Sequence, residues 1–231
     1  MAFNAQGLLN QVLKAGQQAM RQGQERPAER GGQREFGGAL GGLGKQALAG
    51  GALGLLLGNR RRRGLGGGLL RRGGTAMLGL LAYRAFKAWQ TQQGAAGGEP
   101  RTLDRVSGEE ADRQSLAILK AVVAAAKADG HVEERERRLI EAEIGKSEDG
   151  AELRQWLDSE LRKPVDAAEV AAAADSPELA AEMYLASRLV VDSDNHMERA
   201  YLDELARALK LAPELRARLD REAEDAGQGG H

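Results

Sequence analysis

Residues 176–202 read SPELAAEMYLASRLVVDSDNHMERAYL, and this stretch decides the fold class. Ser176 followed by Pro177 is a typical helix start, because a serine side chain caps free backbone amides and proline suits the first helical position. The apolar run that follows predicts a helix over residues 178–191. After a polar turn, a second helix is predicted from apolar residues at helical spacing: Met197, Tyr201, Leu202, Leu205 and Leu209.

The residues on either side contain the same kind of signal. Ser107 with Glu110 three residues later forms a capping box and predicts a helix to about residue 128. Asp166 with Glu169 forms another, for a short alanine-rich helix. Further helices are predicted over residues 133–144, from Asp149 to just before Pro164, and from Pro213 to about residue 226. No segment alternates as a strand does, so we expect an all-α domain of about seven helices over residues 107–226.

This helical region contains an internal repeat. The sequence DGHVE at residues 129–133 matches DNHME at residues 194–198. In each copy an apolar helix is predicted before the motif and an amphipathic helix after it. The two histidines therefore occupy equivalent positions between helices.

Around these turns the sequence resembles the tellurite-resistance TerB-like helical domain. The segments that carry the resemblance are residues 129–134 and 192–202. The order of an N-terminal helix, a glycine-rich apolar segment and an acidic helical domain is similar to the YebE-like inner-membrane family of unknown function. The resemblance implies a bacterial inner-membrane location, no established enzymatic activity, and a role in envelope, tellurite or metal stress. In the second copy Asn195 replaces Gly130, which argues against two equal metal sites.

Three interpretations of the acidic and histidine side chains at the two turns stay open. They can cap the neighbouring helices, form a polar patch for a protein partner, or bind a divalent metal ion. Calcium suits the oxygen ligands but the spacing is not that of an EF-hand, and zinc requires the histidines to converge from different turns. The candidate ligands are Asp129, His131, Glu133, Asp192, Asp194, His196 and Glu198.

The two halves of the chain have opposite charge. Residues 1–98 hold 14 Lys or Arg and 3 Asp or Glu, a net charge of +11, whereas residues 99–231 hold 19 and 31, a net charge of −12. The overall charge of −1 therefore describes neither half. The expected layout is an amphipathic helix at residues 1–21, a flexible linker at 22–35, a glycine-rich apolar region at 36–89, a linker at 90–106, the helical domain at 107–226 and a disordered tail at 227–231.

The glycine-rich region is expected to associate with membrane lipid. Its longest uncharged run, residues 46–59, is too short to span a bilayer alone. Glycines four residues apart give a flat helix face that suits helix packing in lipid: Gly50, Gly54 and Gly58. A second apolar run at residues 73–83 is shorter still. Contacts with anionic headgroups and the membrane interface are expected from Arg60, Arg61, Arg62, Arg63, Arg71, Arg72 and Trp89.

Two other interpretations of the basic half stay open. It is either a low-complexity region with no specific target, or an Arg/Gly arm that binds nucleic acid or another anionic polymer. Two Arg-Gly-Gly triplets favour binding to nucleic acid or another anionic polymer. Aromatic residues, however, make up only 3% of the chain, which is a small share for a surface that stacks on bases. Membrane lipid is therefore the expected partner, with a protein partner or self-association as a further one and nucleic acid as the less favoured alternative.

An enzyme is not expected. The chain has no cysteine, which excludes thiolate nucleophiles and thiolate zinc sites. It also lacks a nucleophile-elbow sequence and a phosphate-binding loop of the P-loop type. We expect no catalytic residues and no certain cofactor, a divalent metal ion being the candidate one.

Overall fold

The structure is a computed structural model that describes residues 74–94, 98–128, 150–191 and 195–228. Across these ranges the regular structure consists of seven helices and no strands, which confirms the all-α fold class. The helices are α3 (Gly74–Gln92), α4 (Glu109–Ala126), α6 (Gly150–Arg162), α7 (Ala167–Ala171), α8 (Pro177–Val190), α9 (His196–Ala208) and α10 (Pro213–Gln228). The predicted N-terminal helix, the helix at residues 133–144 and the cap at Asp149 lie outside the described residues.

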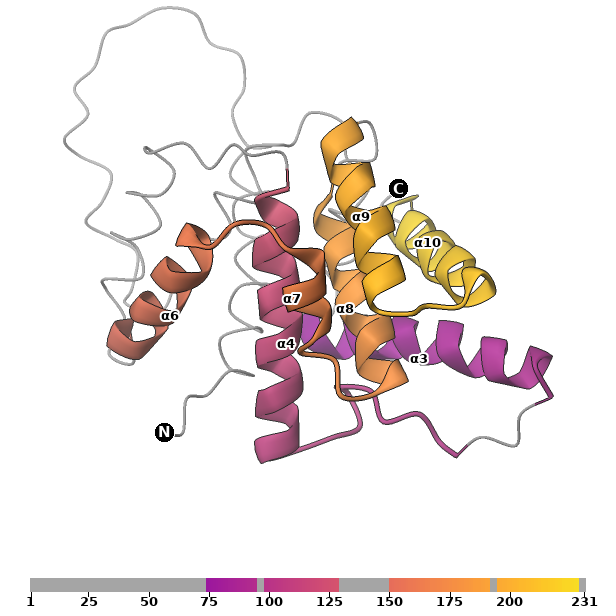
Figure 1. The fold of residues 1–231 in the computed structure, drawn as a ribbon. Coiled ribbons are helices and arrows are strands. Elements are labelled where there is room, and N and C mark those ends of the chain that lie inside the picture. Colours follow the sequence, from indigo (N-terminus) through magenta and orange to yellow (C-terminus); the bar gives the residue numbers. More distant parts are fainter. Residues whose placement is uncertain (1–73, 95–97, 129–149, 192–194, 229–231) are drawn as a thin grey trace, which may run out of the picture.

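The central helix of this arrangement is α8. It packs against α3, α4, α9 and α10. Figure 1 shows α4, α8 and α9 standing side by side, with α3 crossing the lower end of α8. Ten of the fourteen residues of α8 are buried, among them Leu179, Tyr184 and Leu185. A helix that is apolar on all sides must be surrounded by others, and the remaining helices bury their apolar faces against it.

The helices α4 and α8, each of which precedes one copy of the repeat in the sequence, pack together and run in the same direction. Ser187 lies in the second half of α8 and Ala121 in the second half of α4, and Oγ of Ser187 donates a 3.3 Å hydrogen bond to the carbonyl of Ala121. Before α4 begins, the backbone N–H of Leu103 donates to Glu182 in the first half of α8. Helices that are parallel end on the same side of a bundle. The C-terminal ends of α4 and α8 therefore lie on the same side of the helical domain.

Several predicted helix starts are confirmed and one is wrong. The side chain of Asp166 accepts from two backbone amides at the start of α7, and Ser176 accepts from the amide of Leu179 with Pro177 next to it. At α4, however, the cap residue is Gly108, with a φ of 62° and no side-chain hydrogen bond. The left-handed turn at this glycine delays the helix past Ser107. Glu110 consequently pairs with Arg101 instead of completing a capping box.

The helix α3 lies within the range expected to associate with the membrane, but the structure packs one apolar face of this helix against protein. Leu78, Leu81 and Phe86 are buried, and α3 packs against α8 and α10. Among the described helices, none is both long enough and apolar enough to cross a bilayer. The apolar face of α3 therefore belongs to the core of the helical domain, and this domain starts well before residue 107.

The expected linker at residues 90–106 is partly helix and partly packed chain. α3 continues to Gln92, and after it Thr102 and Leu103 are completely or almost completely buried. Glu99 accepts a 2.6 Å hydrogen bond from the hydroxyl of Tyr83 on α3. Gly79 on α3 has no side chain, which allows the backbone of the segment to pass close by. We call residues 98–106 the strap, because they fasten α3 to α4 and α8.

Candidate binding groove

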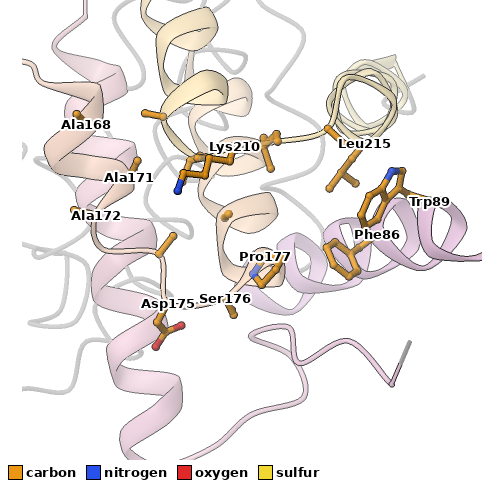
Figure 2. Close-up of a pocket in the computed structure, with 16 residues that line it drawn as sticks. Phe86, Trp89, Ala168, Ala171, Ala172, Asp175, Ser176, Pro177, Lys210 and Leu215 are labelled. Atoms are coloured by element: carbon orange, nitrogen blue, oxygen red, sulfur yellow. The ribbon is translucent and has the colours of Figure 1, made fainter. Parts of the chain in front are cut away.

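The described residues include a groove that is suited to binding, which we call the α3–α7–α10 groove. It has a volume of about 760 Å³ and is shown in Figure 2. Phe86, Trp89 and Leu215 line one side, and the alanines of α7 line the other. The start of α8 and the loop between α9 and α10 complete it. Its size falls within the range of ordinary ligand pockets.

Alanine is the most frequent residue of the groove wall. Ala168 and Ala171 come from α7 and Ala172 caps its end, while Ala208 and Ala212 flank the α9–α10 turn. Alanine at these positions leaves room for a helix or an extended apolar chain to approach the backbone. At the aromatic end, the rings of the α3 residues pack together, with centroids 5.4 Å apart. The groove thus provides apolar contact area and few directional groups.

Two charged residues of opposite sign stand at the rim. Asp175 and Lys210 are both exposed, and neither side chain has a hydrogen bond or an ion pair with the described residues. Their charges cancel, so the rim does not select strongly for an anion or a cation. An occupant with little net charge fits this surface better than an acidic or basic polymer.

Lys210 has an unusual backbone conformation. Its φ is +54°, the left-handed region that glycine adopts most easily. The amides of Lys210 and Leu211 donate to the carbonyls of Arg207 and Ala206, which closes the end of α9 as a Schellman motif. A lysine at the usual glycine position costs about 1 kcal/mol. This conformation sets the lysine across the groove in Figure 2.

Trp89 supplies an unsatisfied donor at the aromatic end. Its indole Nε1 is buried and has no hydrogen-bond partner among the described residues. Most buried polar atoms in proteins do have a partner. The sequence predicts a contact of Trp89 with the membrane interface, whereas in the structure the residue packs against the core of the helical domain.

The structure describes only two of the candidate metal ligands, His196 and Glu198. Their surroundings differ. His196 is exposed, and its Nδ1 lies 2.7 Å from a guanidinium nitrogen of Arg199. Glu198 is fully buried. The turn between α8 and α9 does contain the expected kind of cap, since Asn195 accepts hydrogen bonds from two amides of α9. Asp129, His131, Glu133, Asp192 and Asp194 lie outside the described residues.

The described residues do not form a metal centre. Within the described ranges, no three His, Asp or Glu side chains come together in a way that could hold an ion. The proposed lipid contacts at Arg60, Arg61, Arg62, Arg63, Arg71 and Arg72, and the helix-packing glycines Gly50, Gly54 and Gly58, lie outside the described residues.

The groove itself was not predicted from the sequence. It is built from residues 86–89, 168–180 and 208–215, three segments with no common motif. One signal was present. Lys210 occupies the position after α9 where helices usually have glycine, but the end of the helix must be known before this is visible.

Comparison with known proteins gives a family but not an activity. A family model described as "Protein of unknown function (DUF533)" matches residues 42–223. A Yersinia enterocolitica protein described as "Uncharacterized protein in ampR 5'region" is 35% identical over 120 residues, which are 51% of this chain and 84% of that protein. No solved structure matches the chain.

Proposed function

The chain belongs to the DUF533 family of unknown function, and we propose that it is a non-enzymatic, membrane-associated protein whose helical domain binds an apolar partner. The observation that supports this best is the α3–α7–α10 groove, which is apolar inside and has opposite charges at its rim. Binding of a helix in an apolar groove is a common mode of recognition between proteins. Self-association is one form that such a partnership can take.

Membrane attachment is assigned to residues 36–72. The apolar face of α3 packs inside the helical domain. We therefore propose that lipid is bound by the glycines and arginines that precede Gly74 in the sequence, within residues 36–72. Each arginine near an anionic surface contributes about 1 kcal/mol. The likeness to the YebE-like family of inner-membrane proteins, with a TerB-like domain, agrees with a bacterial inner-membrane location.

The chemistry of the groove supports the non-enzymatic part of the proposal. Its lining contains one carboxylate and one amine, and no histidine, cysteine or tyrosine. A general acid–base pair or an activated nucleophile needs titratable groups within hydrogen-bond reach of each other. The groove offers binding without such a pair.

Flotation of the full chain with vesicles tests the attachment. With vesicles containing phosphatidylglycerol the chain is expected to float, and a variant with Arg60, Arg61, Arg62 and Arg63 changed to Gln is expected to float less. The control Ala172→Glu, which places a charge in the groove, should float like the original chain. Recovery of the full chain in the lipid-free fraction would contradict the proposal. Salt-dependent binding to RNA without flotation would favour the nucleic-acid alternative.

A divalent-metal response is a second candidate, as part of envelope, tellurite or metal stress. The observation in its favour is the parallel course of α4 and α8, because the chain then leaves both helices at the same end for the turns that contain the candidate ligands. Titration calorimetry of the full chain with Ca²⁺ and Zn²⁺ is the test. Heat that is lost in Asp194→Ala and kept in Asp225→Ala would support it, and no heat with either ion would contradict it.

A further inference from the structure

We propose that residues 1–21 of the same chain bind in the α3–α7–α10 groove, as an amphipathic helix that covers it. The inference rests on the proposed function of the groove and names its occupant. The helical domain would then be covered by its own N-terminal segment until a competing partner displaces it.

The groove is open on the side where a helix would enter. Ala168, Ala172 and Pro177 line it and are exposed. Figure 2 shows α7 and the α9–α10 turn separated across it, with the aromatic pair of α3 at the end. An acyl chain needs a narrow, enclosed tunnel to exclude water, whereas a helix can lay one face into an open groove with small side chains.

The N-terminal segment has the matching pattern. Ala5, Leu8, Leu9, Val12 and Leu13 follow the spacing i, i+3, i+4, i+7 and i+8, which places them on one face of a helix. Asparagine and glutamine dominate the rest of the segment, with Lys14 and Arg21 as its charged side chains. Such a helix has an apolar face for the alanine wall and little charge to conflict with the rim residues.

Other apolar parts of the chain fit the groove less well. Residues 36–59 are rich in glycine, which lowers helix stability in water by roughly 1 kcal/mol per residue relative to alanine. They also lack the polar face that a groove-bound helix turns to solvent. The segment at residues 1–21 combines both faces, so it is the better occupant.

The connection is long enough for the segment to reach. Residues 22–73 separate it from α3, and a chain of this length would span on the order of 40 Å if it behaved as a coil. This exceeds the dimension of a domain of this size. A tether of this kind gives effective concentrations of roughly millimolar, so that a weak contact suffices to keep the groove covered.

Disulfide trapping in the full chain tests the proposal, because the chain has no cysteine of its own. The pair Leu9→Cys with Ala172→Cys places one thiol on the apolar helix face and one in the groove. Gln11→Cys with Ala172→Cys is the first control, since residue 11 lies on the opposite helix face. Leu9→Cys with Ala76→Cys is the second, because Ala76 is exposed on α3 about 20 Å from Trp89 and closer in sequence.

The expected result is an intramolecular disulfide in the first pair that forms about tenfold faster than in either control. Equal rates in the three pairs would overturn the proposal. A disulfide only between two chains would show that a second copy occupies the groove, and one seen only with vesicles would show that lipid is required. Either result would overturn it as well.

Alkylation of a single cysteine provides an independent measurement. In the full chain with Ala172→Cys, adding Leu9→Asp and Val12→Asp is expected to raise the rate of maleimide labelling about tenfold. Adding Gln11→Asp and Gln18→Asp is the matched control and should leave the rate unchanged. No increase with the first pair would overturn the proposal. Because neither measurement uses vesicles, failure here is separate from a failure of membrane attachment in flotation.

Discussion

The backbone N–H of Leu103 donates a 2.7 Å hydrogen bond to Oε1 of Glu182, and both residues are buried. This bond joins the strap to the central helix α8. The second carboxyl oxygen, Oε2, has no partner among the described residues. Burial raises the pKa of Glu182 to about 8, although the hydrogen bond from Leu103 acts in the opposite direction. The carboxyl group is therefore mostly protonated at neutral pH.

The stability of the helical domain should depend on pH through Glu182. Its pKa in the folded chain lies above the ordinary value of 4.5, so the folded state binds this proton more tightly than the unfolded state. The stabilisation is complete below about pH 4.5 and is lost as the pH rises through about 8, by up to about 1.4 kcal/mol per pH unit. Glu182→Gln stays neutral and should remove this component.

Urea unfolding between about pH 5 and pH 8.5 measures the effect. The control Glu214→Gln changes an exposed residue of α10 and should keep the original pH dependence. A Glu182→Gln variant that loses as much stability with rising pH as the original chain would contradict the explanation.

The position of α3 in the core can be tested with two neighbouring leucines. Leu81 is 5% exposed and Leu80 is 42% exposed. Leu81→Ala should lower the free energy of unfolding by about 2–5 kcal/mol, because it leaves a cavity, whereas Leu80→Ala should cost less than about 1 kcal/mol. Denaturant unfolding of the full chain without lipid compares them. Similar small losses for both variants would mean that α3 does not pack on α8 and α10.

The contact between α3 and the strap predicts a difference between two glycines. A Cβ atom at Gly79 would lie 2.5 Å from a side-chain oxygen and 2.8 Å from the backbone nitrogen of Asp104, whereas at Gly98 nothing lies within 4 Å. Gly79→Ala should destabilise the chain by about 1–2 kcal/mol after its gain in helix propensity, and Gly98→Ala should be close to neutral. Thermal unfolding followed by circular dichroism decides this, and an increase in stability with Gly79→Ala would refute the close contact.

The conformation of Lys210 predicts a stabilising substitution. Because its φ is +54°, Lys210→Gly should relieve strain and raise the free energy of unfolding by up to about 1 kcal/mol. Lys210→Ala removes the same charge without relieving the strain, so it should leave the stability nearly unchanged. Urea unfolding of the two variants separates charge from conformation, and equal stabilities would show that the strain is absent.

Much of the helical fold could be predicted from local signals. Asp166 and Ser176 cap their helices through bonds to amides two or three residues away, and such bonds depend only on nearby sequence. The predicted cap of α4 at Ser107 is wrong, because the positive φ at Gly108 follows from how the strap enters the helix. No short sequence pattern contains that information.

The environment of α3 and the groove could not be predicted in the same way. An apolar run between arginines is compatible with lipid or with protein, and its partner here is the face formed by α8 and α10, more than 80 residues away. The groove likewise depends on contacts between distant segments. Trp89 and Lys210 both line it, although 120 residues of sequence lie between them. Pairings between distant segments are set by packing, which a single sequence does not reveal.

Hydrogen–deuterium exchange of the full chain, with and without phosphatidylglycerol vesicles, tests most directly that residues 36–72 attach the chain to membrane while the helical domain stays outside the lipid. We predict that vesicles slow exchange in peptides from residues 36–72 and leave peptides from α3 unchanged, because its apolar face is already buried by α8 and α10. Unchanged exchange at residues 36–72, or new protection of α3 on addition of vesicles, would contradict this assignment of the membrane-binding residues.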